Sequence, residues 1–209
     1  AVRMLNEAGI FPDFLLCRAP QPLDDVRKKK LEQNANIIAE HVISAPDVDN
    51  IYQVPINFEK EELGKKILKR INLQPKKQPD WSAWNTLIVN MQKPKNKIKI
   101  AIVGKYLDIG NYALSDSYVS IRESITHASA NCATHAEIVW VDSKTYEQNP
   151  EKVTELKNYQ GVIVPGGFGS SGVEGKIAAI KFCRENNIPY LGLCYGMQLA
   201  VIEFARNVC

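Results

Sequence analysis

The stretch PYLGLCYGMQLA, residues 189–200, decides the fold. An apolar run, Pro189–Leu191, leads into the pattern G-x-C-x-G at Gly192, Cys194 and Gly196, and apolar residues at helical spacing follow. A G-x-S-x-G pattern between a strand and a helix is a nucleophile elbow, a sharp turn that lifts a nucleophile above a sheet. We expect glycines at both positions because side chains there would collide with neighbouring backbone. We also expect strained backbone at Cys194, with its sulfur at a helix N-terminus that favours the thiolate.

Strand and helix signals alternate from residue 98 to the elbow. This alternation predicts an α/β fold with a doubly wound parallel sheet, in which ligands bind at the carboxyl ends of the strands. Both glycine-rich segments follow predicted strands. The predicted strands are Ile100–Val103, Ile138–Val141, Gly161–Val164 and Pro189–Leu191, and the predicted helices contain Tyr118–Ala128, Val173–Ile180 and Met197–Phe204.

The second glycine-rich segment is PGGFGSSG, residues 165–172. Its glycines at 167, 169 and 172 match the G-x-G-x-x-G pattern of dinucleotide sites. That pattern also needs an acidic residue at the end of the next strand, where Leu193 and Cys194 stand. We therefore favour an oxyanion hole, in which backbone N–H groups of this loop and of Tyr195 bind an acyl oxygen on Cys194. A buried, inert Cys194 with glycines for tight packing is the alternative.

The first 97 residues have a different pattern. The sequence predicts a buried strand at Phe14–Cys17, a charged surface helix at Asp24–Asn34 and one helix over Glu59–Ile71. Prolines, lysines and asparagines from Asn72 to Lys97 indicate a linker. Within this linker, Trp81, Trp84 and Ile88 recur at i, i+3 and i+7, which predicts an amphipathic helix. Helix patterns run into both chain ends, so we expect a piece of a longer protein.

Composition and charge exclude several classes of protein. The chain has 209 residues, and 26 basic less 23 acidic residues give a net charge of +3, which does not indicate binding to nucleic acid or membrane. Apolar runs of about six residues are too short for a span of ~20. Five dispersed cysteines indicate a reducing, cytoplasmic environment. His127, Cys132 and His135 have no zinc-site spacing, and we predict no metal site.

A family resemblance rests on longer motifs. VPGGFG at 164–169, GVEG at 172–175 and RENNIPYLGLCYGMQ at 184–198 resemble the class I glutamine amidotransferase domain of the CTP synthase family, and VGKY at 103–106 resembles its opening. Cys17-Arg18, Lys30 and Asp47–Tyr52 resemble the end of the family's synthetase domain. The resemblance implies the C-terminal part of a P-loop-like α/β synthetase (amidoligase) domain at 1–74 and an interdomain linker with a short helix at 75–97. It implies an incomplete amidotransferase domain at 98–209.

The resemblance also implies the chemistry. In the family, glutamine is hydrolysed through a cysteine thioester, ATP phosphorylates O4 of UTP, and the released ammonia displaces phosphate to give CTP. The implied partners are UTP, ATP with Mg²⁺, glutamine, a GTP activator and, at full length, further copies in a homotetramer. Magnesium ligands are expected outside this chain.

Residue by residue, the resemblance assigns one nucleophile and two binding sets. A lysine suits phosphate as a point charge, and a planar arginine can stack on a base. Cys194 matches the nucleophile; Gly167, Tyr195, Gly196, Met197 and Gln198 match glutamine-binding positions; Lys30 matches a UTP/CTP contact, and Arg18 and Val48 match ATP contacts.

Some positions depart from the family pattern. Ser171 stands where Arg is usual and Tyr195 where Leu is usual, and Asp108–Ser115 is longer than in many relatives; these changes bear on loop behaviour and GTP activation. The family's catalytic His and Glu follow the cysteine, whereas His41, His127 and His135 all precede Cys194. We therefore expect this chain alone to be inactive. The alternatives are another Cys-elbow hydrolase, a redox-sensing domain, or a scaffold without catalysis.

Overall fold

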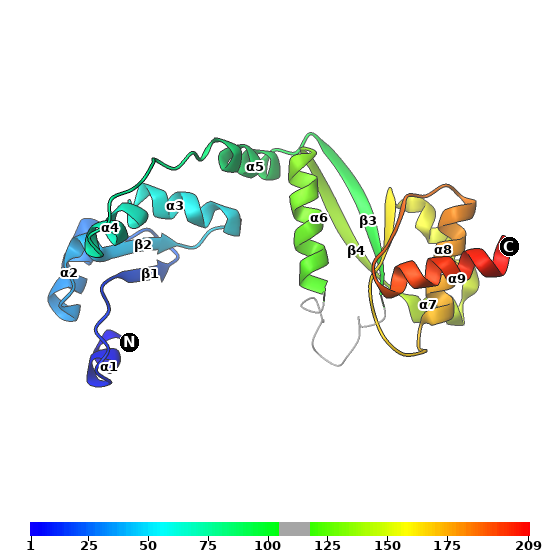
Figure 1. Ribbon diagram of the computed structural model, residues 1–209, viewed down its shortest axis with the longest axis horizontal. Coiled ribbons are helices and arrows are strands. Elements are labelled where there is room, and N and C mark those ends of the chain that lie inside the picture. Colours follow the sequence, from blue (N-terminus) through cyan, green and yellow to red (C-terminus); the bar gives the residue numbers. More distant parts are fainter. Residues whose placement is uncertain (105–117) are drawn as a thin grey trace. The chain divides into compact units, whose positions relative to one another are not determined.

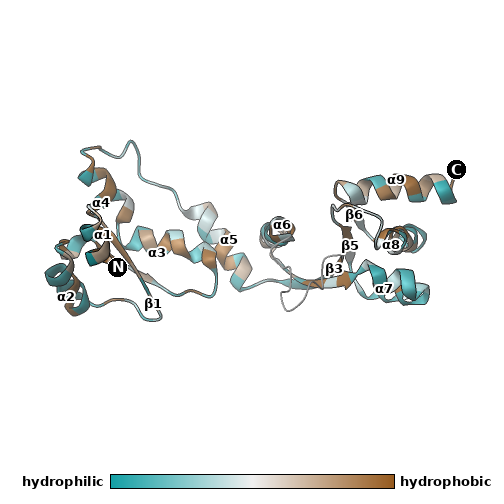
Figure 2. Cartoon of the chain, turned by 90° about the horizontal axis from the view of Figure 1, so that it is seen from below, coloured by the Kyte–Doolittle hydropathy of each residue, from teal (hydrophilic) through white to brown (hydrophobic). Residues whose placement is uncertain are grey.

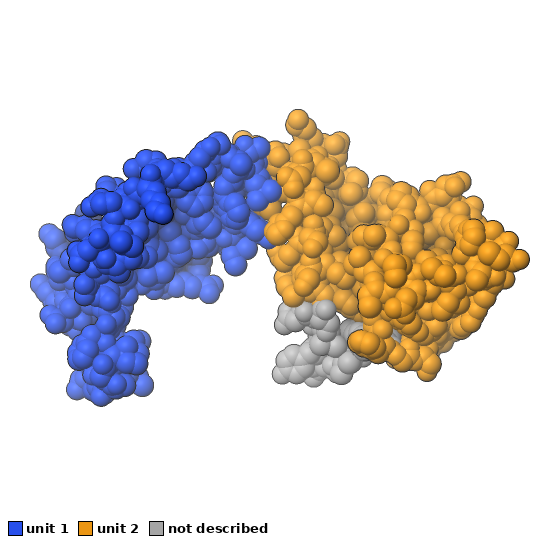
Figure 3. All heavy atoms as spheres, viewed as in Figure 1, with its two compact units in different colours: residues 1–88 blue, residues 89–209 orange. Residues whose placement is uncertain are grey.

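A computed structural model describes residues 1–104 and 118–209, which form two compact units, Ala1–Ile88 and Val89–Cys209 (Figure 3). The boundary between the units falls within helix α5 (Ser82–Gln92). Each unit contains a parallel sheet of its own. The motif residues Lys105 and Tyr106 and the segment Asp108–Ser115 lie outside the described residues.

The second unit is built on a four-stranded parallel sheet (Figure 1). In the order β4-β3-β5-β6, β3 pairs with β4 on one side and with β5 on the other, so the strand order reverses beside β3. Open α/β sheets bind ligands at the carboxyl ends of the strands at such a reversal. The glycine-rich loop follows β5 directly. The strands are β3 (Asn96–Gly104), β4 (Thr134–Asp142), β5 (Gly161–Val164) and β6 (Tyr190–Gly192).

Helices cover both faces of this sheet, because successive side chains of a strand point to opposite faces. Ala101 and Val103 pack in the core with helices α8 and α9, whereas Ile98 and Ile100 line an apolar cavity with Ile125 of α6. The predicted doubly wound α/β architecture is confirmed. The helices are α6 (Val119–Asn131), α8 (Val173–Glu185) and α9 (Tyr195–Asn207), and the core on the α8 side also holds Val141, Leu156, Val164, Ile177, Ile180, Cys183 and Leu199.

Two elements between β4 and β5 were not predicted. They are α7 (Ser143–Gln148) and the 3₁₀ helix η4 (Pro150–Asn158). Helix α7 packs closely on α8, since a Cβ on Gly175 would overlap the carbonyl group of Ser143. This segment has few apolar residues, so it shows no hydrophobic periodicity that would predict a helix. Figure 2 shows α7 mainly in the hydrophilic colour.

The first unit contains the parallel pair β1 (Leu15–Ala19) and β2 (Val42–Pro46). Helix α2 (Asp25–Ala35) lies between them in the chain and begins where the Asp24 carboxylate accepts a hydrogen bond from the Arg27 N–H, at 2.8 Å. The predicted helix there is confirmed; β2 was missed. The core of this unit contains Ala35, Ile37 and Val42 with Val2, Leu15, Cys17, Leu23 and Leu31, and its short elements are α1 (Val2–Glu7), η1 (Ala39–His41) and η2 (Ile51–Gln53).

The predicted single helix over residues 59–71 is wrong. Two helices, α3 (Val54–Lys60) and α4 (Leu63–Arg70), are separated by a turn at which Glu62 has a φ of 53°. A left-handed residue cannot continue an α-helix, so the apolar spacing spans a break.

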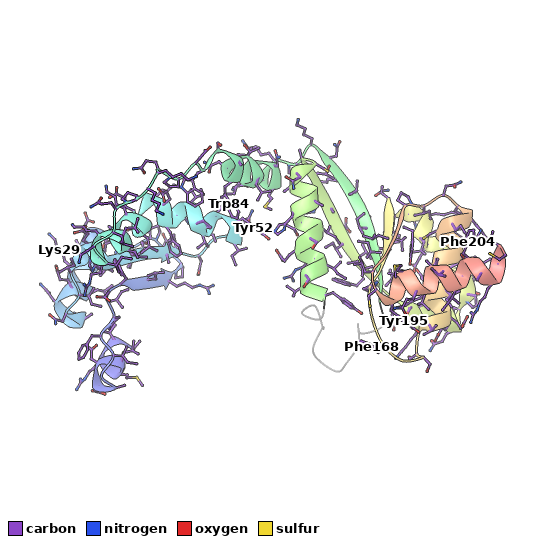
Figure 4. All side chains as sticks on the ribbon, in the orientation of Figure 1. Lys29, Tyr52, Trp84, Phe168, Tyr195 and Phe204 are labelled. Atoms are coloured by element: carbon purple, nitrogen blue, oxygen red, sulfur yellow. The ribbon has the colours of Figure 1, made fainter. Side chains whose placement is uncertain are left out.

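The helix predicted inside the linker is present as α5. Its Trp84 indole N–H donates to the Tyr52 carbonyl oxygen at 2.8 Å, and the two rings lie 6.0 Å apart between centroids (Figure 4). The N-terminal part of α5, which belongs to the first unit, is therefore held to η2 through Trp84 and Tyr52. Among the described helices, none has the length and apolar character needed to cross a membrane.

Candidate active site

Cys194 occupies the turn between β6 and α9, where its backbone has φ 51° and ψ −105°. Sparsely populated backbone of this kind costs a non-glycine residue about 1–3 kcal/mol and persists where the surroundings enforce it. Cys194 is also the N-cap of α9, and its side chain is exposed. The strained elbow expected from the sequence is therefore present.

The two glycines of the elbow lie against backbone. A Cβ on Gly196 would overlap the carbonyl oxygen of Val164, and one on Gly192 would lie 2.6 Å from the Tyr190 hydroxyl and 2.7 Å from the Gly196 carbonyl carbon. No side chain fits at either position without displacing the turn. The predicted reason for the glycines is confirmed.

Hydrogen bonds hold the turn in place. The Leu193 N–H donates to the Val164 carbonyl oxygen at 3.0 Å, and the Tyr190 hydroxyl donates to the Gly196 carbonyl oxygen at 2.8 Å. Burial raises the pKa of the Tyr190 phenol, so this group remains a donor at neutral pH. The elbow is thereby tied to the ends of β5 and β6.

The loop after β5 passes next to the cysteine. A Cβ on Gly166 would lie 3.5 Å from Cβ and 3.9 Å from Sγ of Cys194. Gly169 and Gly172 have φ values of 77° and 75°, which favour glycine, and α8 begins directly after Gly172. Phe168, in the same loop, is 84% exposed (Figure 4). Loop backbone and thiol thus line one side of the candidate site.

Lys176, in the first turn of α8, is fully buried. Its Nζ donates to the Pro165 carbonyl oxygen at 3.5 Å and lies 5.9 Å from the centroid of the Tyr195 ring. Sequence reasoning missed this residue. A usable signal was its place between Val173 and Ile180, at i+3 and i−4 on the apolar face of the helix.

An ion pair joins the two helices that follow the loops. Glu203 of α9 is buried, and its carboxylate accepts hydrogen bonds from Nε of the Arg184 guanidinium of α8, at 3.3 and 3.0 Å, and from its Nη2, at 2.8 Å. A second pair, Arg206 with Glu174, is exposed. The helix that carries Cys194 at its N-terminus is therefore fixed against α8.

The cysteines of this unit differ in environment. Cys183 is fully buried in the core, and burial raises the pKa of its thiol to about 11. Cys194 is exposed at the strained turn. The alternative of a buried, inert thiol therefore describes Cys183 and not Cys194.

The first unit contains the residues expected to contact nucleotides. Arg18 ends β1 and Asp47 follows β2, and the Arg18 Nε donates to the Asp47 carboxylate at 2.8 Å. This hydrogen bond raises the pKa of the Arg18 guanidinium further. Arg18, Asp47 and Val48 line a cavity of about 330 Å³, whereas Lys30, on exposed α2, is outside its lining. The other lining residues are Ala45, Pro46, Ile51, Val54, Asn57 and Phe58.

Metal ligands do not gather in residues 1–104 and 118–209: no three His, Cys, Asp or Glu side chains there could hold one ion. Asp47, the acidic residue in the lining of the cavity beside Arg18, already accepts a hydrogen bond from the Arg18 guanidinium. The described residues therefore contain no preformed magnesium site.

Comparison with known proteins places both units in one family. The model for glutamine amidotransferase class-I matches residues 113–209, and the model for the CTP synthase N-terminus matches residues 1–73. The CTP synthases of Sulfolobus acidocaldarius and Sulfurisphaera tokodaii are 45% and 47% identical over 208 residues, covering 100% of this chain. The chain belongs to the CTP synthase family.

The chain spans 38% of the length of these CTP synthase relatives. A solved structure described as the Trypanosoma brucei CTPS glutaminase domain with bound acivicin is 42% identical, with a TM-score of 0.48, and the match covers 53% of this chain and 41% of that chain.

Within the CTP synthase framework, the predicted glutamine-binding set falls on two adjacent segments. Tyr195, Gly196, Met197 and Gln198 form the first turn of α9, and Gly167 follows the glycine that lies next to Cys194. The contacts of these residues with glutamine remain a prediction, as do the nucleotide contacts of Arg18, Val48 and Lys30.

Proposed function

We propose that this chain supplies the glutamine-hydrolysing nucleophile and part of the nucleotide site of an enzyme that aminates UTP to CTP with ATP and glutamine. One observation carries the proposal: Cys194 is exposed on strained backbone at the N-terminus of α9, beside the glycine-rich loop after β5. The family of the chain supports glutamine as the substrate of that thiol.

In the glutaminase step, the Cys194 Sγ attacks the side-chain amide carbon of glutamine. The oxygen of the tetrahedral intermediate becomes negative, and backbone N–H groups of Tyr195 and the glycine loop stabilise it. The C–N bond then breaks, the nitrogen takes a proton and leaves as ammonia, and a thioester remains. Water hydrolyses the thioester to glutamate and restores the thiol.

The proton for the departing ammonia needs a general acid, whose help is worth about 10²–10⁴-fold. The resemblance places that histidine and its acidic partner after the nucleophile. His41, His127 and His135 all precede Cys194. We therefore expect a polypeptide of these 209 residues alone to release glutamate far more slowly than the complete enzyme.

In the synthetase step, the first unit contributes to nucleotide binding. The cavity beside Arg18 and Val48 combines apolar walls with one guanidinium, which suits a stacked adenine of ATP. Lys30, exposed on α2, suits a phosphate of UTP or CTP. ATP phosphorylates O4 of UTP, ammonia displaces the phosphate, and the products are CTP, ADP and phosphate.

The domain assignment is part of the same proposal. Residues 1–74 belong to the synthetase domain, 75–97 to the linker and 98–209 to the amidotransferase domain. The boundary of the compact units, between Ile88 and Val89, falls inside the proposed linker and supports this division. A cytoplasmic location, activation by GTP and a homotetramer complete the proposal on the basis of the family.

The test uses the complete enzyme that carries these residues, with Cys194→Ser and, as a matched control, Cys132→Ser at another exposed cysteine. Cys194→Ser is expected to lose CTP formation from glutamine and keep CTP formation from added ammonia. Cys132→Ser is expected to keep both activities. Glutamine-dependent CTP formation by Cys194→Ser at the wild-type rate would refute the proposal.

A further inference from the structure

Lys176 is a fully buried cation next to the candidate active site. We propose that Lys176 is a positioning residue of the glutaminase reaction, which holds the two backbone segments that form the oxyanion hole. This inference rests on the proposed function. It concerns a residue that touches neither the thiol nor glutamine in the proposed reaction and acts through Pro165 and Tyr195.

The first segment is the peptide between Pro165 and Gly166. Its carbonyl oxygen and the Gly166 N–H belong to one rigid plane and point in opposite directions. When the Lys176 ammonium binds that oxygen, it fixes the direction of the Gly166 N–H and strengthens its dipole. This peptide matters because Gly166 lies next to Cys194, with its would-be Cβ 3.9 Å from Sγ.

The second segment is the residue after the nucleophile. The Lys176 Nζ lies 5.9 Å from the centroid of the Tyr195 ring, within the range of a cation–π contact. Such contacts are stronger when the cation is removed from water, as Lys176 is. The Tyr195 N–H is the other proposed donor to the oxyanion. One ammonium therefore contacts both segments from behind the site.

Packing alone does not explain a lysine here. Removing an ammonium from water is costly, and an apolar side chain of similar length would fill the same space without that cost. The neighbouring residues on this helix face, Val173, Ile177 and Ile180, are apolar and pack in the core. Because burying the Lys176 ammonium costs free energy, we infer that its charge serves the glycine-rich loop and Tyr195, which it contacts.

The test compares Lys176→Met with Lys176→Gln in the complete enzyme. Both side chains are one atom shorter than lysine, but Met is apolar and loses the donor, whereas Gln keeps an N–H₂ group directed along the same path toward the Pro165 carbonyl. If the side chain only packs, Met is the better replacement in both stability and activity. If it positions the loop, kcat for glutamine hydrolysis follows the order Lys, Gln, Met, while thermal stability favours Met over Gln.

For Lys176→Met we expect kcat for glutamine to fall about 10- to 100-fold, somewhat less than the loss of a direct oxyanion donor. The KM for glutamine and CTP formation from ammonia should stay within about twofold, since charge develops on the oxyanion only in the transition state. Lys181→Met, at a half-exposed position of the same helix, is the control and should match the wild type.

An unchanged kcat in Lys176→Met, or a higher kcat for Met than for Gln, would overturn the inference. So would a change confined to KM. A wild-type enzyme that hydrolyses no glutamine would instead refute the proposed function, so the two failures are distinct.

Discussion

The candidate site of the second unit is defined by backbone contacts, whereas that of the first unit is defined by exposed side chains. In the second unit, backbone contacts define the site: Gly192 and Gly196 leave no room for a side chain, and Cys194 is held in a strained conformation. In the first unit, Arg18 and Asp47 meet through an ion pair whose side chains are 86% and 47% exposed. Buried steric contacts hold a fixed geometry, whereas exposed ion pairs contribute little to it.

This difference matches the two proposed roles, catalysis in the second unit and nucleotide binding in the first. Thioester chemistry needs a nucleophile and oxyanion donors already in place, because their arrangement in advance of the reaction lowers its barrier. A nucleotide brings its own charges and can order flexible side chains as it binds. We therefore expect substitutions to affect folding most at the elbow, and substrate affinity most in the first unit.

The largest effect is expected at Gly196. Gly196→Val places a branched side chain against the Val164 carbonyl and should lower the free energy of unfolding by several kcal/mol, from strain and overpacking together. Gly64→Val, in the first unit, is the matched control. A Cβ at Gly64 meets no atom within 4 Å, and its effect should stay within about 0.5 kcal/mol. Chemical denaturation measures both, and equal losses would remove the steric basis of the elbow.

A smaller effect on the free energy of unfolding is expected from the buried thiol of Cys183, in the core of the second unit. An unfolded chain loses the Cys183 proton near pH 9, whereas in the folded chain its pKa is about 11. As the pH rises above 9, ionisation of the thiol stabilises the unfolded state before it can occur in the folded state. The free energy of unfolding therefore falls between pH 9 and pH 11, by roughly 2 kcal/mol for this group.

Cys183→Ala should remove that part of the pH dependence. Cys17→Ala, in the less buried core of the first unit, should remove less of it, because the nearby Lys28 opposes the rise in its thiol pKa. Denaturation at pH 8 and pH 10.5 measures the difference. A larger change from Cys17 would contradict the comparison of the two cores.

The smallest effect is expected in the first unit. Lys30→Ala in the complete enzyme should raise the KM for UTP by about tenfold, as expected for one lost charge-assisted contact, and leave glutaminase activity unchanged. Lys29→Ala is the control, since Lys29 is the adjacent exposed lysine of α2 (Figure 4). Equal losses of UTP-dependent and glutaminase activity in Lys30→Ala would argue against a nucleotide contact.

The sequence predicts those features that depend on local pattern. The elbow, its glycines, the strain at Cys194 and the alternating strands of the second unit all have short-range signals. The prediction of one helix over 59–71 failed because its apolar residues keep one helical spacing across the break between α3 and α4. The break occurs at Glu62, which has a left-handed backbone, and no glycine in the sequence signals it.

Features that depend on tertiary contacts were not predictable in the same way. Lysine is usually exposed, and the spacing of Lys176 from Val173 and Ile180 is a weaker signal of burial than the packing of α8 that the structure shows. The approach of Gly166 to Cys194 joins two loops that are 28 residues apart. Strand β2 was missed from the sequence because it has five residues and no alternating pattern. Its parallel pairing with β1 identifies it in the structure.

The most direct test of the central claim is covalent labelling of the complete enzyme with a glutamine-like electrophile, followed by peptide mass spectrometry. Cys194 is exposed on the elbow, as Cys132 and Cys209 are exposed elsewhere, and Cys183 is buried. We expect one label per chain, on Cys194, with excess glutamine preventing it and Cys194→Ser abolishing it. Labelling that falls on Cys132 or Cys209, or that glutamine does not slow, would contradict the assignment of Cys194 as the glutaminase nucleophile.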